Sequence, residues 1–211
     1  MAKILISLFL FCHACAEVFK LPAEFFVTER LIALTSTFDI ADASITMAKA
    51  TKRCFALTSA YDLENADSQP MAKATARFFS WGTIADVTDS EGRKIGCIEE
   101  NLWKILPWAQ YRIFNAENQL VAIATMNFCG TYFTLHDPDF SERVFAIMSR
   151  PFIRCCRDAW TVQIVDKEIF EKGWVDPRLL VLLAIYQTDK ENRARFYREV
   201  YQAIERDLKD Q

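Results

Sequence analysis

The sequence predicts a mainly β protein: an antiparallel β-barrel closed around a hydrophobic helix near the carboxyl end. Residues 179–186 are eight consecutive apolar residues, too few to cross a bilayer, which takes about 20. Asp176 is a favourable N-cap and Pro177 suits the first position of a helix, so we expect a helix over residues 177–188. A helix that is apolar on every side must be buried on every side. The chain before it is rich in strand-forming residues, and a sheet curled around the helix satisfies both conditions.

An internal repeat with a spacing of roughly two dozen residues predicts the strands. Each unit is a strand with aromatic or β-branched residues, a polar turn of Asp, Asn, Ser or Gly, and a second strand. The units begin at Phe38, Tyr61, Asp86 and Tyr111. Four such hairpins form a β-meander, and closing it removes its exposed edges. Further strands are expected at residues 25–34, 126–136, 143–148 and 159–166, with a connector at 101–108.

The second strand of three units has alanine at alternate positions, which share one face of a strand. These residues are Ala48, Ala50, Ala72, Ala74, Ala76, Ala122 and Ala124. Small side chains that face inward leave room for a helix, and Lys49, Lys73 and Arg77 then face outward. The alternative is that the alanines lie on a solvated face.

A second helix is expected after the apolar one, because Thr188 and Glu191 have the spacing of a capping box. It runs to about Lys209 and has apolar residues at helical spacing. These are Phe196, Tyr197, Val200, Tyr201, Ile204 and Leu208. We expect this stripe to pack on the barrel as a lid, and a helix that binds a partner is the alternative.

The first 16 residues resemble a targeting segment, with one early lysine, an apolar run, and small residues at Ala14–Ala16. Cleavage after Ala16 predicts an exported protein (periplasmic, envelope-associated or secreted), and without cleavage the protein is cytoplasmic. A buried first strand or helix is the alternative. The predicted organisation is a signal peptide at 1–16, a barrel domain at 17–190 and a C-terminal helix at 191–211.

Composition and motifs give no sign of catalysis, a metal or a cofactor. The net charge of −3 and pI near 5.5 exclude a strong nucleic-acid footprint. Cys129 and His136 are seven residues apart, which puts them on opposite faces of a regular strand. Cys155 and Cys156 lie between two arginines that can lower a thiol pKa. An enzyme that depends on Cys or His is therefore the remote alternative.

With the hairpin repeat and the apolar helix in place, the chain resembles the tubby C-terminal-like superfamily, in its LURP-one-related and phospholipid-scramblase-like branch. Residues 111–125 and 160–188 carry the resemblance best. It implies a closed twelve-stranded barrel threaded by the helix. Tubby proteins are phosphoinositide-binding membrane adaptors and scramblases are calcium-responsive, whereas the LURP-one branch has no settled activity. The acidic calcium-binding stretch of scramblases has its nearest counterpart at 137–142, which a proline-containing turn explains.

Two groups of basic residues are candidate contacts for an anionic lipid headgroup. The first is Lys49, Lys52, Arg53, Lys73 and Arg77, and the second is Arg150, Arg154 and Arg157. The alternative is an ordinary solvated face balanced by acidic turns. The expected function is that of an exported, non-enzymatic barrel that binds an anionic phospholipid or an envelope protein. The alternative is an adaptor that docks a partner through its C-terminal helix, and the oligomeric state is left open.

Overall fold

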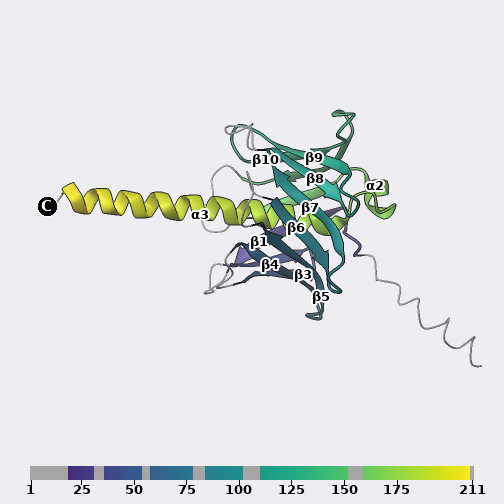
Figure 1. Ribbon diagram of the computed structural model, residues 1–211, viewed down its shortest axis with the longest axis horizontal. Helices are drawn as coiled ribbons and strands as arrows, with labels where there is room; N and C mark the ends of the chain where they lie inside the picture. Colours follow the sequence, from purple (N-terminus) through teal and green to yellow (C-terminus); the bar gives the residue numbers. More distant parts are fainter. Residues whose placement is uncertain are drawn as a thin grey trace, which may run out of the picture.

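The structure, a computed structural model, is a closed β-barrel around one end of a long helix (Figure 1). It describes residues 19–30, 36–53, 58–77, 84–101, 110–151 and 159–209, except for the side chains of 193–196 and 207–209. The predicted targeting segment and all of the predicted connector at 101–108 except Asn101 lie outside these residues. The predicted fold class, a closed antiparallel barrel with a helix in its bore, is confirmed.

Twelve strands form the barrel, and each pairs with the next in the sequence until β1 closes against β12. They are β1 Glu24–Arg30, β2 Thr37–Ala41, β3 Thr46–Lys52, β4 Ala60–Asn65, β5 Pro70–Ala76, β6 Ile84–Asp89, β7 Lys94–Glu100, β8 Gln110–Asn115, β9 Leu120–Met126, β10 Tyr132–His136, β11 Val144–Ser149 and β12 Ala159–Ile164. The four predicted hairpins are β2–β3, β4–β5, β6–β7 and β8–β9. The strand predicted from residue 126 is wrong at its start, because residues 127–131 form the turn between β9 and β10.

Three of the four polar turns of the repeat, at Asn65, Asp89 and Asn115, share one hydrogen-bonding scheme. In the β4–β5 turn, the Oδ1 atom of Asn65 accepts the backbone N–H of Gln69 at 2.8 Å, and in the β8–β9 turn Asn115 accepts that of Gln119 at 2.9 Å. The side chain thus replaces a missing backbone partner at each strand end. This local chemistry explains why the turns were readable from the sequence.

The alanines of the repeat face the bore, as predicted. Six of them, at positions 48, 50, 72, 74, 122 and 124, are at most 5% exposed, and Ala76, at the end of β5, is half-buried. The helix that they accommodate is buried from Leu179 to Tyr186, and both Leu180 and Leu183 are 0% exposed. Each fully buried leucine contributes about 1.5–3 kcal/mol of transfer free energy, so the bore is the main apolar core.

One glycine sets the distance between the helix and the wall. A Cβ atom on Gly96 of β7 would lie 2.2 Å from the backbone oxygen of Phe114 and 3.0 Å from a methyl group of Leu179. Contacts below 3 Å between such atoms are not tolerated, so any larger residue must push β8 or the helix away. Gly96 therefore allows the close approach of strand, strand and helix.

The helix α3 spans Pro177–Lys209 without interruption. It begins as predicted, since the Asp176 carboxylate accepts the backbone N–H of Arg178 at 2.9 Å. The predicted second helix at Thr188 is wrong, because the Thr188 hydroxyl bonds back to the Ala184 carbonyl at 2.9 Å within continuous helix. No Gly or Pro interrupts residues 178–209, so nothing in the backbone ends the helix where it leaves the barrel.

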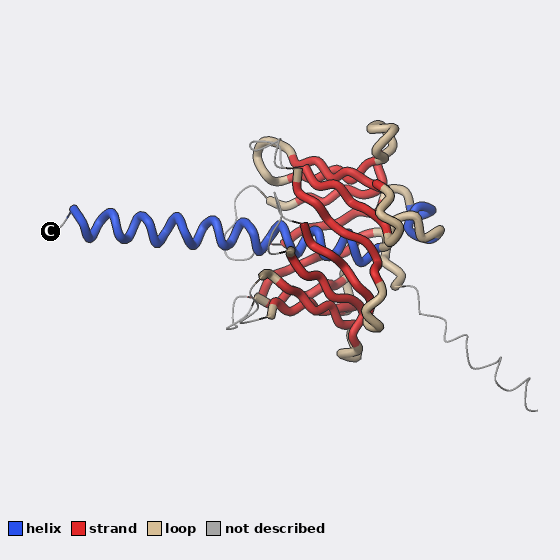
Figure 2. The backbone as a smooth tube through the Cα atoms, in the orientation of Figure 1, coloured by secondary structure: helices blue, strands red, loops and turns tan. Residues whose placement is uncertain are grey.

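The predicted packing of this segment on the barrel is also wrong. Figure 2 shows the helix leaving the barrel and continuing away from it as a rod. We refer to residues 193–209 as the projecting segment. The opposite end of the barrel holds the tight hairpin turns and a short helix that the sequence analysis missed, α2 (Lys167–Glu171), which is capped by Asp166.

Candidate functional site

Six consecutive residues of α3, at positions 187–192, bind the barrel where the helix leaves it, and we call them the polar collar. Each contacts a different partner around the mouth. The pairs are Gln187 with Tyr111 (2.5 Å), Thr188 with Trp160 (3.0 Å), Asp189 with Lys52 (2.6 Å) and Tyr61 (2.7 Å), Lys190 with Glu100, Glu191 with Arg150 (2.5 Å), and Asn192 with Glu29. Since the contacts surround the helix, they resist both its rotation and its withdrawal.

Asp189 is the most buried acid of the collar, at 2% exposed. One oxygen of its carboxylate accepts a hydrogen bond from the Lys52 ammonium, and the other accepts one from the Tyr61 hydroxyl. A buried charge of this kind is tolerated only when its partners are present. The collar therefore depends on long-range pairing between the helix and strands β3 and β4.

Tyr111 of β8 is fully buried, and its hydroxyl donates to the side chain of Gln187 in the collar at 2.5 Å. Burial raises the pKa of Tyr111 well above its ordinary value of 10.0, with a smaller contribution from Glu100. The hydroxyl thus stays protonated and acts as a donor throughout the neutral range.

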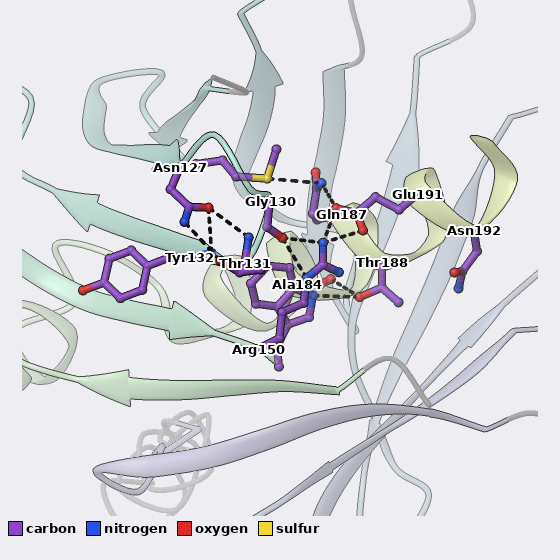
Figure 3. Close-up of polar contacts among 12 residues, drawn as sticks. Asn127, Gly130, Thr131, Tyr132, Arg150, Ala184, Gln187, Thr188, Glu191 and Asn192 are labelled. Atoms are coloured by element: carbon purple, nitrogen blue, oxygen red, sulfur yellow. Dashed lines mark hydrogen bonds and ion pairs between the residues drawn. The ribbon is translucent and has the colours of Figure 1, made fainter. Parts of the chain in front are cut away.

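Arg150 joins three parts of the structure (Figure 3). Its guanidinium group donates to the Gly130 carbonyl at 2.6 Å and to both carboxylate oxygens of Glu191 at 2.7 and 2.5 Å. It also lies over the Trp160 ring, 4.1 Å from the ring centroid. Its side chain is 1% exposed, so it has no access to a lipid headgroup. The prediction of Arg150 as a lipid contact is wrong, and Arg154 and Arg157 of the same predicted cluster lie outside the described residues.

The first basic cluster is divided between three environments. Lys52 binds Asp189 of the polar collar, whereas Arg53 donates to Asp62 and Arg77 to Asp86, at 2.5 and 2.6 Å respectively. Both arginines are about half exposed. Three of the five basic side chains of the predicted cluster are therefore held in pairs of opposite charge.

Lys49 and Lys73 face outward as predicted, but they are not adjacent. Lys49 lies on β3 and Lys73 on β5, with β4 between them, which is a separation of about 10 Å at 4.8 Å per strand. On the intervening strand, Glu64 is opposite Lys49 and Asp62 is opposite Lys73. The repeat thus places acidic side chains of β4 between the two lysines.

The sequence contained a signal for these pairs. An arginine is followed nine residues later by its aspartate at 30/39, 53/62 and 77/86, and the ion-paired atoms are 2.5–2.6 Å apart. The fourth unit has an amide pair at the matching positions, Asn101 and Gln110, at 3.0 Å. We interpret the series as a structural feature of the repeat, since exposed ion pairs of this kind contribute only about 0–1 kcal/mol each.

The projecting segment presents large apolar side chains to solvent. Tyr197 is 60% exposed, Val200 38%, Tyr201 73% and Ile204 50%. Their spacing of three, four and seven residues puts them on one face of the helix. These four residues belong to the apolar stripe that the sequence predicts. The side chains of its other two members, Phe196 and Leu208, are outside the described residues. A contiguous exposed apolar face of this kind is typical of an interaction site.

A groove of about 690 Å³ lies at the other end of the barrel, next to the loop between α2 and α3. Trp174 and Leu120 are exposed apolar residues of its lining. The lining also contains five acids, Asp89, Glu117, Asp137, Asp139 and Asp176, and three cations, Arg93, Lys94 and Arg178. Arg93 is paired with Asp89 at 2.7 Å and Arg178 with Asp176 at 2.6 Å, while Lys94 donates to Asn118. The lining is therefore mildly acidic.

Cys129 and His136 do not meet. Cys129 is exposed in the β9–β10 turn, while His136 ends β10 at the far end of the strand. The His136 ring nitrogens lie 3.0 Å from the Asp137 carbonyl and 3.3 Å from the Thr125 hydroxyl. Cys97 is buried, and burial raises the pKa of its thiol, whereas a nucleophilic thiol requires a lowered pKa. Cys155 and Cys156 are outside the described residues.

The described part of the chain contains neither a group of metal-binding side chains nor a membrane-spanning helix. No three His, Cys, Asp or Glu side chains within it lie close enough together to hold a metal ion. Of its helices, none combines the length and the apolar composition needed to cross a membrane.

The comparisons with known proteins show that the fold of this chain is similar to that of a solved structure. No protein-family model matches the chain, and no curated protein sequence matches it. Among solved structures, the chain is similar to the X-ray structure of a protein from Arabidopsis thaliana, AT5G01750. The TM-score is 0.54 at 13% sequence identity, over 81% of this chain and 93% of that chain. The similarity therefore supports the β-barrel architecture.

Proposed function

We propose that the protein is a non-enzymatic adaptor, in which the barrel is a rigid base and the projecting segment is a preformed helix that docks another helix. The observation that carries the proposal is the exposed apolar face of Tyr197, Val200, Tyr201 and Ile204. A large apolar side chain on a solvated helix gains little stability for the free protein. It becomes favourable when a partner removes it from water.

The anchoring of the helix supports this role. A free helix shorter than about 12–15 residues is marginal in water, because the first turn is costly to form. Here the helix is already formed in the bore before it leaves the barrel, and the polar collar holds its last buried turn. The projecting segment thus extends an existing helix, which lowers the ordering entropy that a partner has to overcome.

The same geometry gives less support to the lipid-binding alternative. Arg53 and Arg77 are paired with aspartates, and Lys52 is bound by Asp189. An anionic headgroup has to compete with these carboxylates for each cation. Lipid binding stays a prediction, and sedimentation with anionic and neutral liposomes tests it: an equal distribution between the two compositions rejects a headgroup site.

Site-specific photo-cross-linking in the producing cells tests the docking proposal. A photo-reactive phenylalanine analogue replaces Tyr197 or Ile204 on the apolar face, and Gln202 on the opposite side serves as the matched control. We expect adducts of discrete mass from the two apolar positions and none from position 202. We also expect a Val200→Asp change in the same chain to remove them. Equal labelling from all three positions, or none, contradicts the proposal.

Two further parts of the proposed role concern lineage and compartment. We propose that the barrel is of the tubby C-terminal-like, LURP-one-related type, which is supported by the twelve-stranded closure around a helix. We also propose export after cleavage behind Ala16. Amino-terminal sequencing of the mature protein tests the latter: a chain that begins at Glu17 supports it, and a chain that begins at Met1 rejects it.

A further inference from the structure

We infer that the helix which docks on the projecting segment is the same segment of a second copy, antiparallel to the first and centred on Tyr201. This inference rests on the proposed function and names its partner. Three independent features support it: the space beside the helix, the length of the projecting segment, and the distribution of charge along it.

The space beside the helix excludes a parallel pair. Packed helices lie 8–10 Å apart, and two sheets stacked face to face lie about 10 Å apart. The barrel wall surrounds α3 as far as the polar collar. Two parallel helices in register would bring the two barrel mouths to the same level. The barrel wall of each copy would then overlap the helix of the other copy. An antiparallel pair puts the barrels at opposite ends.

The length of the projecting segment fits an antiparallel pair. Residues 193–209 have their midpoint at Tyr201, which is the most exposed member of the apolar face at 73%. At a rise of 1.5 Å per residue, Lys209 lies about 12 Å from this midpoint, and the last residue of the second copy's collar, Asn192, lies about 13.5 Å from it. A pair centred on Tyr201 therefore leaves room for residues 193–209 of both copies between the two barrels.

The charges of the segment are complementary only when the two copies run in opposite directions. Residues 193–198 contain three arginines and no acid, whereas residues 199–207 contain three acids and one arginine. A parallel pair would place the arginine-rich halves together, but an antiparallel pair places each against an acidic half. In a pair centred on Tyr201, Arg198 lies level with residue 204 of the second copy and is therefore next to Glu205 of that copy. Arg198 and Glu205 lie on the same flank of the apolar face.

The Arg198–Glu205 relation also provides a test that only a homodimer passes. In one chain these residues are seven apart, about 10.5 Å along the axis, while ion pairs within a helix form at spacings of three or four. Arg198→Glu alone and Glu205→Arg alone each create like charges across the proposed interface. The double change restores opposite charges there and does not create an intrahelical pair between the two positions.

The experiment is sedimentation equilibrium of the full chain from about 1 to 200 µM at low and high salt, because an interface of this size is at the small end of specific contacts. We expect a monomer–dimer equilibrium with a micromolar Kd. Each single charge reversal is expected to weaken it about 10-fold, and the double reversal to return it to within about 3-fold of the wild type. Tyr201→Lys places two ammonium groups at the dyad and is expected to abolish the dimer, with Gln202→Lys as the control on the opposite side.

Circular dichroism verifies that every variant keeps its helix. A chain that stays monomeric over this range overturns the inference, as does a dimer that survives Tyr201→Lys or a double reversal that fails to rescue. These outcomes are distinct from failure of the proposed function. Adducts from positions 197 and 204 at a mass other than twice that of the chain identify a different protein as the partner and leave the docking role intact.

Discussion

Replacing Asp189 with alanine is expected to loosen the helix in the barrel more than any other single change in the polar collar. Asp189 is 2% exposed and binds Lys52 at 2.6 Å and Tyr61 at 2.7 Å. Tyr61 is itself 1% exposed, so removing the carboxylate takes an acceptor from a buried hydroxyl.

The magnitude follows from the two hydrogen bonds that are lost. A buried hydroxyl that loses its acceptor costs about 1–3 kcal/mol, and the charge-assisted bond from Lys52 is worth about 1.5–3 kcal/mol. The Lys52 side chain is 25% exposed, which allows partial hydration and favours the lower part of that range. The sum is a loss of about 3–5 kcal/mol of unfolding free energy, or about 6–20 °C in Tm for a chain of this size.

Urea unfolding followed by tryptophan fluorescence measures the loss, with far-UV circular dichroism as a second probe of cooperativity. Asp189→Asn is the matched control, since it keeps one acceptor oxygen and removes the charge. We expect it to lie between the wild type and Asp189→Ala. The pair Lys52→Met with Asp189→Leu removes both charges together and is expected to be less destabilising than Asp189→Ala.

A loss below about 1 kcal/mol for Asp189→Ala would refute the reasoning, because a value in that range is typical of an exposed ion pair. The reasoning would also be refuted if the losses of unfolding free energy from Lys52→Met and Asp189→Leu were additive, since two residues in direct contact are expected to show coupling.

Three further results are expected. Gly96→Ala is expected to destabilise the fold by about 1–3 kcal/mol through overpacking against Phe114, and a thermal melt unchanged from the wild type would contradict this close contact. Burial raises the pKa of Tyr111, so its stabilising contribution is complete below the unfolded value of about 10 and is lost as the pH rises through the higher folded value. Alkaline unfolding is therefore expected to be less steep with pH in Tyr111→Phe. Hydrogen bonds from the Ile45 and Ser44 amides lower the pKa of Asp42. Its contribution is thus present above about pH 3.9 and is lost as the pH falls through the lower folded pKa. The Tm difference between wild type and Asp42→Asn is expected to shrink on acidification, and a constant difference would exclude the role of this carboxylate.

Local patterns made most of the barrel predictable. The alternation of alanines at 48, 50, 72 and 74 depends only on the two-residue period of a strand, and all four lie in the bore. The turns at Asn65 and Asn115 are closed by their own side chains. The apolar run at 179–186 required a surrounding wall, which the meander supplies.

The sequence-based predictions were wrong where a residue that matches a local pattern binds a residue far away in the sequence. Thr188 and Glu191 match a capping box, yet Thr188 accepts the indole N–H of Trp160 and Glu191 binds Arg150. Arg150 reads as a surface cation, but the closure of the barrel puts it over a tryptophan. Polar contacts between residues more than a hundred positions apart, as between Lys52 and Asp189, leave no periodic trace.

The sequence by itself determined the hairpins, the inward face of each strand and the burial of the apolar helix, because these depend on spacing and on the transfer of apolar groups from water. Only the tertiary structure decided where the helix leaves the barrel, which charges neutralise one another, and that the second half of α3 projects from the barrel with its apolar face exposed. These features depend on which strands close around the helix, and a one-dimensional pattern does not contain that information.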